Sequence, residues 1–105
     1  MDKAALDRLA VAQLVDDWVL HRDAGDWERF RAVWHDDGIM QATWTQGRVD
    51  EFIAVSKAGW DKGVRIVHFQ GGHTADIVGD RAVSLVKMMI RQRGIVHDEI
   101  GRAHV

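Results

Sequence analysis

Apolar residues recur at spacings of three and four along the first 22 residues of the chain. Side chains at this spacing lie on one face of an α-helix, so the pattern predicts an amphipathic helix. The apolar positions are Leu6, Leu9, Ala10, Leu14, Trp18 and Val19. Gly25 predicts the end of the helix, because glycine adopts the left-handed conformation that commonly follows a helix.

Two further helices are predicted by the same periodicity. Asp26 can cap the first of them, which carries Glu28 in its first turn and ends at His35-Asp36-Asp37-Gly38. The next helix runs from about Val49 to Trp60, and Asp61-Lys62-Gly63 breaks it. Their apolar positions are Trp27, Phe30, Val33 and Trp34 in the first, and Val49, Phe52, Ile53 and Trp60 in the second.

Residues elsewhere alternate with a period of two, which is typical of β-strands. A short strand is predicted from Ile39 to Trp44, with a turn at Gln46-Gly47. Longer strands are predicted at Val64 to Gln70, Thr74 to Val78 and Arg81 to Gln92, and Gly79-Asp80 forms a hairpin turn between the last two. Because no helix alternates with these strands, the sequence predicts an α+β fold with helices on one face of an antiparallel sheet.

Composition narrows the class of protein. A length of 105 residues without a Pro/Ser-rich linker indicates one domain, and 14 basic residues interspersed with 16 acidic ones leave no basic stripe for nucleic acid. The absence of cysteine excludes disulfides and thiol catalysis. The start of the chain lacks the apolar run of a secretory signal, and no run approaches about 18 apolar residues, so we expect a cytoplasmic protein that does not enter membranes.

One histidine falls on an apolar face of a predicted strand. Val64, Ile66, His68 and Gln70 share that face, so His68 points inward with apolar neighbours. A neutral imidazole can take up a proton, and a carboxylate bonded to its other ring nitrogen would stabilise the imidazolium. From the residues alone, a core histidine bonded to a backbone carbonyl is the better interpretation of His68, and a solvated residue at a helix end is the better interpretation of Asp23.

Three stretches of the sequence together resemble one known family. The segment from Trp18 to Asp37, with Asp23-Ala24-Gly25-Asp26-Trp27 at its centre, is similar to the opening of its members. Val67-His68-Phe69-Gln70-Gly71-Gly72 and the hairpin Asp76-Ile77-Val78-Gly79-Asp80 resemble their central strands. The family that these stretches resemble is the SnoaL-like branch of the nuclear transport factor 2-like superfamily. The likeness spans roughly residues 5 to 93. It implies a cone-shaped, curved antiparallel or mixed sheet with three N-terminal helices packed on its concave face.

The resemblance also implies an activity. The family includes polyketide cyclases, scytalone dehydratase, bile-acid dehydratase and hexachlorocyclohexane dehydrochlorinase, besides members with no demonstrated activity. In its lyases an Asp at the end of the first helix orients a His on the central sheet, which takes a proton from carbon. Asp23 and His68 match this pair by position. The expected function is therefore a lyase or isomerase that needs no cofactor and acts on a small, largely apolar cyclic molecule.

The chain departs from the family at a further pocket position. Some of the lyases have Tyr or Lys where this chain has Trp18, and an indole can stack on a ring but cannot release a proton to a leaving group. His73, just beyond Gly71-Gly72, is a candidate for the missing polar group. Trp18, Trp44, Met88 and Ile90 are candidates for the pocket wall, although core packing explains the same residues.

Family members continue into further strands that close the cone, so we expect residues 1–99 to be an incomplete domain whose closing C-terminal strands are missing. Residues 100–105, Ile-Gly-Arg-Ala-His-Val, are expected to be a non-native tail, because a common sequencing adapter encodes this run in one frame. The intact parent is expected to be a homodimer through its open sheet face.

Two other functions stay open. One is a non-catalytic module that binds a hydrophobic ligand or dimerises, which Trp18 favours; the other is the small subunit of a ring-hydroxylating oxygenase, which would need a large apolar sheet face. A metal site built from His35-Asp36-Asp37 and His97-Asp98-Glu99 is not expected, because no two His residues have the helical spacing of a zinc motif. We read the first run as the polar exit of a helix.

Overall fold

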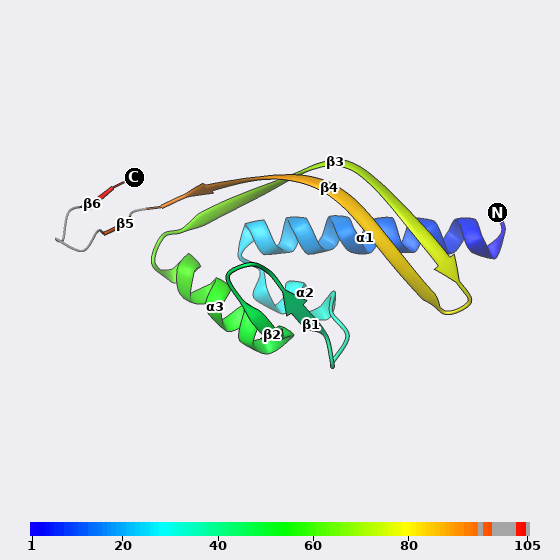
Figure 1. Ribbon diagram of the computed structural model, residues 1–105, viewed down its shortest axis with the longest axis horizontal. Helices are drawn as coiled ribbons and strands as arrows, with labels where there is room; N and C mark the ends of the chain where they lie inside the picture. The colour runs from blue at the N-terminus through cyan, green and yellow to red at the C-terminus, as the bar shows by residue number, and fades with distance from the viewer. Residues whose placement is uncertain (95, 98–102, 105) are drawn as a thin grey trace.

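Three helices and a long antiparallel hairpin dominate the chain in a computed structural model (Figure 1), which describes residues 1–94, 96–97 and 103–104. The helices are α1 (Lys3–Ala24), α2 (Trp27–Ala32) and α3 (Val49–Asp61). The strands are β1 (Ile39–Gln41), β2 (Gln46–Arg48), β3 (Arg65–Val78), β4 (Arg81–Arg93), β5 (Val96–His97) and β6 (Ala103–His104). They pair antiparallel as β1 with β2, β3 with β4 and β5 with β6, which confirms the α+β class.

Helix α1 begins and ends at the residues that its sequence indicates. The Asp2 side chain accepts a hydrogen bond from the backbone N–H of Ala5 at 2.8 Å, which caps the first turn. Gly25 has a φ of 70° and its N–H donates to the Arg22 carbonyl at 3.2 Å. A Cβ at Gly25 would lie 2.6 Å from the Trp60 ring, so close packing requires glycine here as well.

The segment between α2 and α3 differs from the prediction. The expected strand from Ile39 to Trp44 ends at Gln41, and Gln46-Gly47, expected as a turn, belongs to β2 and pairs with β1. The turn lies between Ala42 and Thr45 instead, where the N–H of Ala42 donates to the Thr45 carbonyl at 2.8 Å. Trp44 therefore lies at the tip of a small hairpin.

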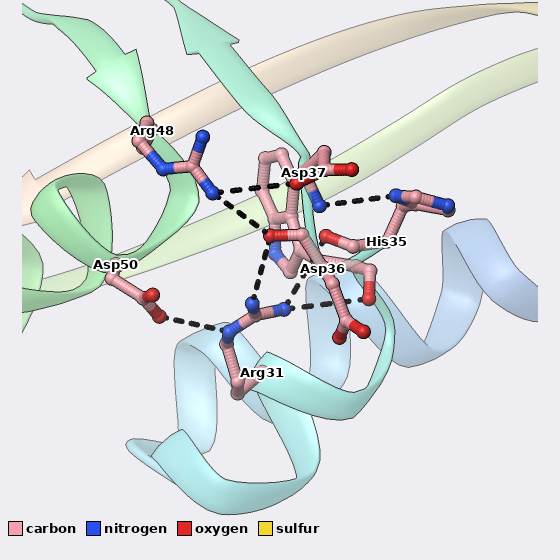
Figure 2. A network of polar contacts seen from close by, with 7 residues as sticks. Arg31, His35, Asp36, Asp37, Arg48 and Asp50 are labelled. Atoms are coloured by element: carbon pink, nitrogen blue, oxygen red, sulfur yellow. Dashed lines mark hydrogen bonds and ion pairs between the residues drawn. The ribbon is translucent and has the colours of Figure 1, made fainter.

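Helix α2 leads into a polar exit that Arg31 organises (Figure 2). Its Nε–H donates to Asp50 at 2.8 Å, and its other N–H groups donate to the carbonyl oxygens of residues 34–36 at 3.3–3.4 Å. Arg48 adds an ion pair to Asp37 at 3.5 Å. These contacts hold the segment after α2 against the start of α3. The helix itself ends at Ala32, earlier than the predicted end at His35-Asp36-Asp37-Gly38.

The hairpin β3–β4 arches along α1, with its tip beside the N-terminal half of the helix (Figure 1). The two strands predicted at Val64 to Gln70 and Thr74 to Val78 are one continuous strand, interrupted by a bulge. Gly71 and Gly72 together oppose Lys87, and Gly72 has a φ of 142°. Because the bulge adds one residue, the residues facing the helices are even-numbered before it and odd-numbered after it.

The core lies among the three helices rather than along the hairpin. Phe30 is completely buried, and the Trp18 ring lies 5.1 Å from it, edge to face. Val49 and Phe52 of α3 are also buried. The face of β3–β4 that points away from the helices is uncovered, with exposed apolar side chains at Val67, Phe69, Val83, Leu85 and Met89.

Within the residues that the structure describes, no helix combines the length and the apolar character needed to cross a membrane. The boundary expected after residue 99 and the tail expected at 100–105 lie outside the described residues, apart from 103–104, and stay predictions.

Candidate functional site

Asp23 and His68 are in direct contact, although 45 residues separate them. Oδ1 of Asp23 lies 2.6 Å from Nδ1 of His68, and Oδ2 accepts the backbone N–H of His68 at 2.7 Å. The side chains are only 17% and 8% exposed, respectively. Because an ionised carboxylate can only accept, Nδ1 carries a proton and Nε2 of the neutral ring keeps a free lone pair.

Two hydrogen-bonded residue pairs join α1 to β3 and bring Asp23 and His68 together. Asp16 and Asp23 are seven residues apart on α1 and so lie on the same face of the helix. Asp16 accepts a hydrogen bond from Gln70 at 2.9 Å, while Asp23 binds His68. Gln70 and His68 are two residues apart and share one face of β3. The spacing on the helix and the spacing on the strand thus fix one element against the other.

His68 lines an open cavity of about 1060 Å³ between the helices and the concave face of β3–β4. Its wall is mostly apolar, and its volume is slightly above the roughly 300–1,000 Å³ that is typical of ligand pockets. The residues predicted for a pocket wall, Trp18, Trp44, Met88 and Ile90, all line it. Trp44 and Ile90 are 59% and 57% exposed, so they lie at the rim.

Trp18 is the side chain that packs against the His68 ring. The two ring centroids are 5.4 Å apart with an interplanar angle of 87°, an edge-to-face arrangement. Trp18 also stacks on Phe52 at 6.4 Å. It therefore links the aromatic core to the imidazole and leaves part of its surface for the cavity.

His73 does not line this cavity, contrary to the expectation that it supplies a polar group there. It lines a smaller pocket against the N-terminal half of α1, and its Nε2 lies 2.7 Å from the hydroxyl of Ser84. Val86, which pairs with His73 across the hairpin, and Ser84 do line the large cavity, so among the described residues His73 is connected to that cavity through the Ser84 hydroxyl.

Three cavity residues with unpaired polar groups were not identified from the sequence. Arg22 is 5% exposed, and burial lowers the pKa of its guanidinium, an effect that the neighbouring Asp23 charge opposes. Ser56 is also 5% exposed, and neither its hydroxyl nor the buried indole N–H of Trp34 has a hydrogen-bond partner within the described residues. Helical spacing could have placed two of them in the cavity wall, since Arg22 is four residues after Trp18 and Ser56 is four residues after Phe52.

No three His, Asp or Glu side chains come together as metal ligands in the part of the chain that the structure describes. His97-Asp98-Glu99 lies outside the residues whose side chains are described. The polar side chains that line the cavity include His35, Thr43, Ser84 and Gln92 besides His68, Arg22 and Ser56.

Comparisons with known proteins give consistent results. A family model described as a SnoaL-like domain matches residues 3–100. Pea pathogenicity protein 2 of Fusarium vanettenii is 43% identical over 96 residues, which cover 88% of this chain and 41% of that protein. An uncharacterized protein of Emericella nidulans is 41% identical over 99 residues, covering 90% and 41%, and a PEP2-like protein of Fusarium vanettenii is 41% identical over 96 residues, covering 88% and 41%. The chain thus spans about two fifths of the length of these curated relatives.

Proposed function

This chain belongs to the SnoaL-like domain family, and we propose that it is the core of a lyase or isomerase in which His68 takes a proton from a carbon of a cyclic, largely apolar molecule. The observation that carries the proposal is the 2.6 Å contact between Asp23 and His68 at the wall of an apolar cavity. A carboxylate placed there holds the imidazole in one tautomer and stabilises it once it is protonated.

The proposed step begins at Nε2 of His68. Its lone pair takes the proton, and the electrons of the C–H bond form a double bond. In an isomerisation these electrons pass to an adjacent carbonyl, giving an enolate, and the protonated His68 returns the proton to a different carbon. In an elimination they expel a leaving group from the neighbouring carbon. Trp18 contacts His68 but has no acidic proton, so it favours isomerisation or the loss of a leaving group that departs as a stable anion.

A binding function without catalysis is the second candidate. Trp18 stands where a proton donor would assist many eliminations, and the same apolar wall would hold a hydrophobic molecule equally well. The uncovered face of β3–β4, with Phe69, Leu85 and Met89 more than half exposed, supports homodimerisation. It would also suit a subunit interface of the ring-hydroxylating oxygenase type. The arch of β3–β4 along α1 supports the proposed cone.

Proton exchange at carbon separates catalysis from binding. We would incubate the chain in D₂O with 2-tetralone, a bicyclic ketone with acidic C–H groups, and follow the loss of its α-proton signals by NMR. The wild type should exchange these protons faster than buffer, and His68→Ala should exchange them at the buffer rate. Equilibrium dialysis with the same ketone measures binding. Equal exchange by both proteins, with binding retained, would leave only the binding function; neither exchange nor binding would remove both candidates.

A further inference from the structure

A positive charge is buried in the wall of the cavity. Arg22 is 5% exposed and lines the cavity, and no hydrogen bond or ion pair of its side chain is found among residues 1–94. The Trp27 ring covers the guanidinium at 5.2 Å, but a ring face leaves the N–H groups at the edge unsatisfied. The nearby Asp23 carboxylate is already bonded to His68 through both oxygens. Buried charges are normally paired or hydrogen-bonded, and among residues 1–94 the Asp23 charge beside Arg22 is not joined to it by a hydrogen bond or ion pair.

Ser56, on α3, lines the same cavity as Arg22. Helices α1 and α3 run in the same general direction, toward the start of β3 (Figure 1). The two helices are in contact at two places. The rings of Trp18 and Phe52 are stacked, and nearer the C-terminal ends of both helices Gly25 lies close to the Trp60 ring. Arg22 and Ser56 each fall between these two contacts. The Ser56 hydroxyl has no partner among the described residues, so the wall of this cavity holds a second unused donor.

We propose that Arg22 and Ser56 form the anchor for a carboxylate group on the molecule that the cavity holds. The inference rests on the proposed function only in placing the ligand in this cavity. Arg22 can only donate, and its planar fork matches the two oxygens of a carboxylate. The unpaired indole N–H of Trp34, also in the cavity wall, is likewise a donor. An acidic ligand with a ring would place the ring in the apolar part of the cavity and its oxygens on these donors.

The charges of the site agree with an anionic ligand. Arg22, ionised Asp23 and neutral His68 sum to zero, whereas proton uptake by His68 makes the cluster positive. A carboxylate bound at Arg22 would offset that charge within the cavity, where the low dielectric strengthens such an interaction. The anchor would therefore select acidic ring compounds and also favour protonated His68.

The test compares 2-naphthoate with its neutral amide, 2-naphthamide, by equilibrium dialysis against the full 105-residue chain. The two probes have nearly the same shape and differ mainly in charge. We expect the wild type to bind the acid more tightly, and Arg22→Leu to weaken binding of the acid about 10- to 100-fold while binding of the amide stays unchanged. Ser56→Ala should weaken binding of the acid by about 3- to 10-fold. The matched control is Arg29→Leu, which removes an exposed arginine that does not line the cavity.

Three results would overturn the anchor: equal affinity of the wild type for both probes, equal weakening of both probes by Arg22→Leu, or no binding of either probe. Arg22→Lys keeps the charge and should retain part of the preference for the acid, which guards against a folding defect in Arg22→Leu; circular dichroism checks both variants. Failure here is distinguishable from failure of the proposed function. Loss of the acid preference with proton exchange intact removes only the anchor, whereas an acid preference with no proton exchange removes only the catalytic proposal.

Discussion

The two halves of β3 each carry an inward-facing histidine, but the two side chains lie in different surroundings. Before the bulge, His68 is buried, binds a carboxylate and lines a large apolar cavity. After the bulge, His73 binds a hydroxyl and lines a smaller pocket against the start of α1. A carboxylate stabilises an imidazolium, and a neutral hydroxyl does so far less. Position on a strand face is therefore insufficient to make a histidine a base; its partner and its surroundings decide.

The largest expected effect separates the two histidines by activity. Asp23→Asn keeps the shape of the side chain but removes the negative charge, so it should lower the rate of proton exchange by about 10²- to 10⁴-fold. His73→Ala should leave the rate unchanged, because His73 does not line the cavity. Both rates come from NMR of 2-tetralone in D₂O. Equal decreases of the exchange rate in Asp23→Asn and His73→Ala would show that the two histidines do not differ in the way described.

The next effect is on the free energy of unfolding. It compares the two contacts that join α1 to β3, Asp23 with His68 and Asp16 with Gln70. Asp23→Ala leaves the backbone N–H and the ring of His68 without their acceptor, and should lower the free energy of unfolding by about 2–4 kcal/mol. Asp16→Ala removes an exposed contact with Gln70 and should cost about 0.5 kcal/mol. Urea unfolding followed by tryptophan fluorescence measures both values. A cost for Asp16→Ala as large as that for Asp23→Ala would contradict the distinction in burial.

The bulge that divides β3 can be tested at its two glycines. Gly72 has a φ of 142°, a conformation that side chains rarely adopt, so Gly72→Ala should destabilise the chain by about 1–3 kcal/mol. Gly71 has no positive φ, and an added Cβ would make only ordinary contact with Lys87 at 3.6 Å. Gly71→Ala should therefore be neutral or stabilise by up to about 1 kcal/mol. Thermal unfolding of the two variants would show whether the bulge requires glycine at one position only.

The smallest expected effect concerns Arg22, which lies in the cavity on the His68 side of the bulge. Arg22→Leu removes a desolvated charge together with a cation–π contact, and the free energy of unfolding should change by less than about 1 kcal/mol. Arg31→Leu removes the contacts that organise the exit of α2 and should cost about 1–3 kcal/mol. Chemical unfolding compares them directly. A large loss for Arg22→Leu would mean that this arginine stabilises the fold rather than the ligand.

Local patterns were sufficient for much of the fold. The ends of α1, the extent of α3 and the Gly79-Asp80 turn are fixed by neighbouring residues, through caps, periodicity and glycine conformation, and each could be predicted. The strand β2 could not. The turn closes between Ala42 and Thr45, which leaves Gln46-Gly47 to pair with β1, and propensity does not resolve a shift of that size.

Some residues of the candidate site could likewise be predicted from the sequence, and others could not. Family resemblance placed Asp23 and His68 at matching positions, and they lie in contact. His73 was misplaced although Val86, which pairs with it, lines the large cavity, because alternation along a strand does not tell which of two neighbouring pockets a side chain reaches. Arg22 was missed because a charged residue on an apolar stripe is ordinarily assigned to the solvated side of a helix, and only the tertiary structure reveals its burial.

The protonation pattern of the His68 ring tests the central claim most directly. We would record ¹⁵N–¹H correlations of the imidazole at alkaline pH, where the ring is neutral, in the wild type and in His68→Ala to assign the signals. A proton on Nδ1, with Nε2 shifted on addition of 2-tetralone, is the expected result. A proton on Nε2, or an Nε2 signal that no cavity ligand alters, would show that His68 has no free lone pair facing the cavity.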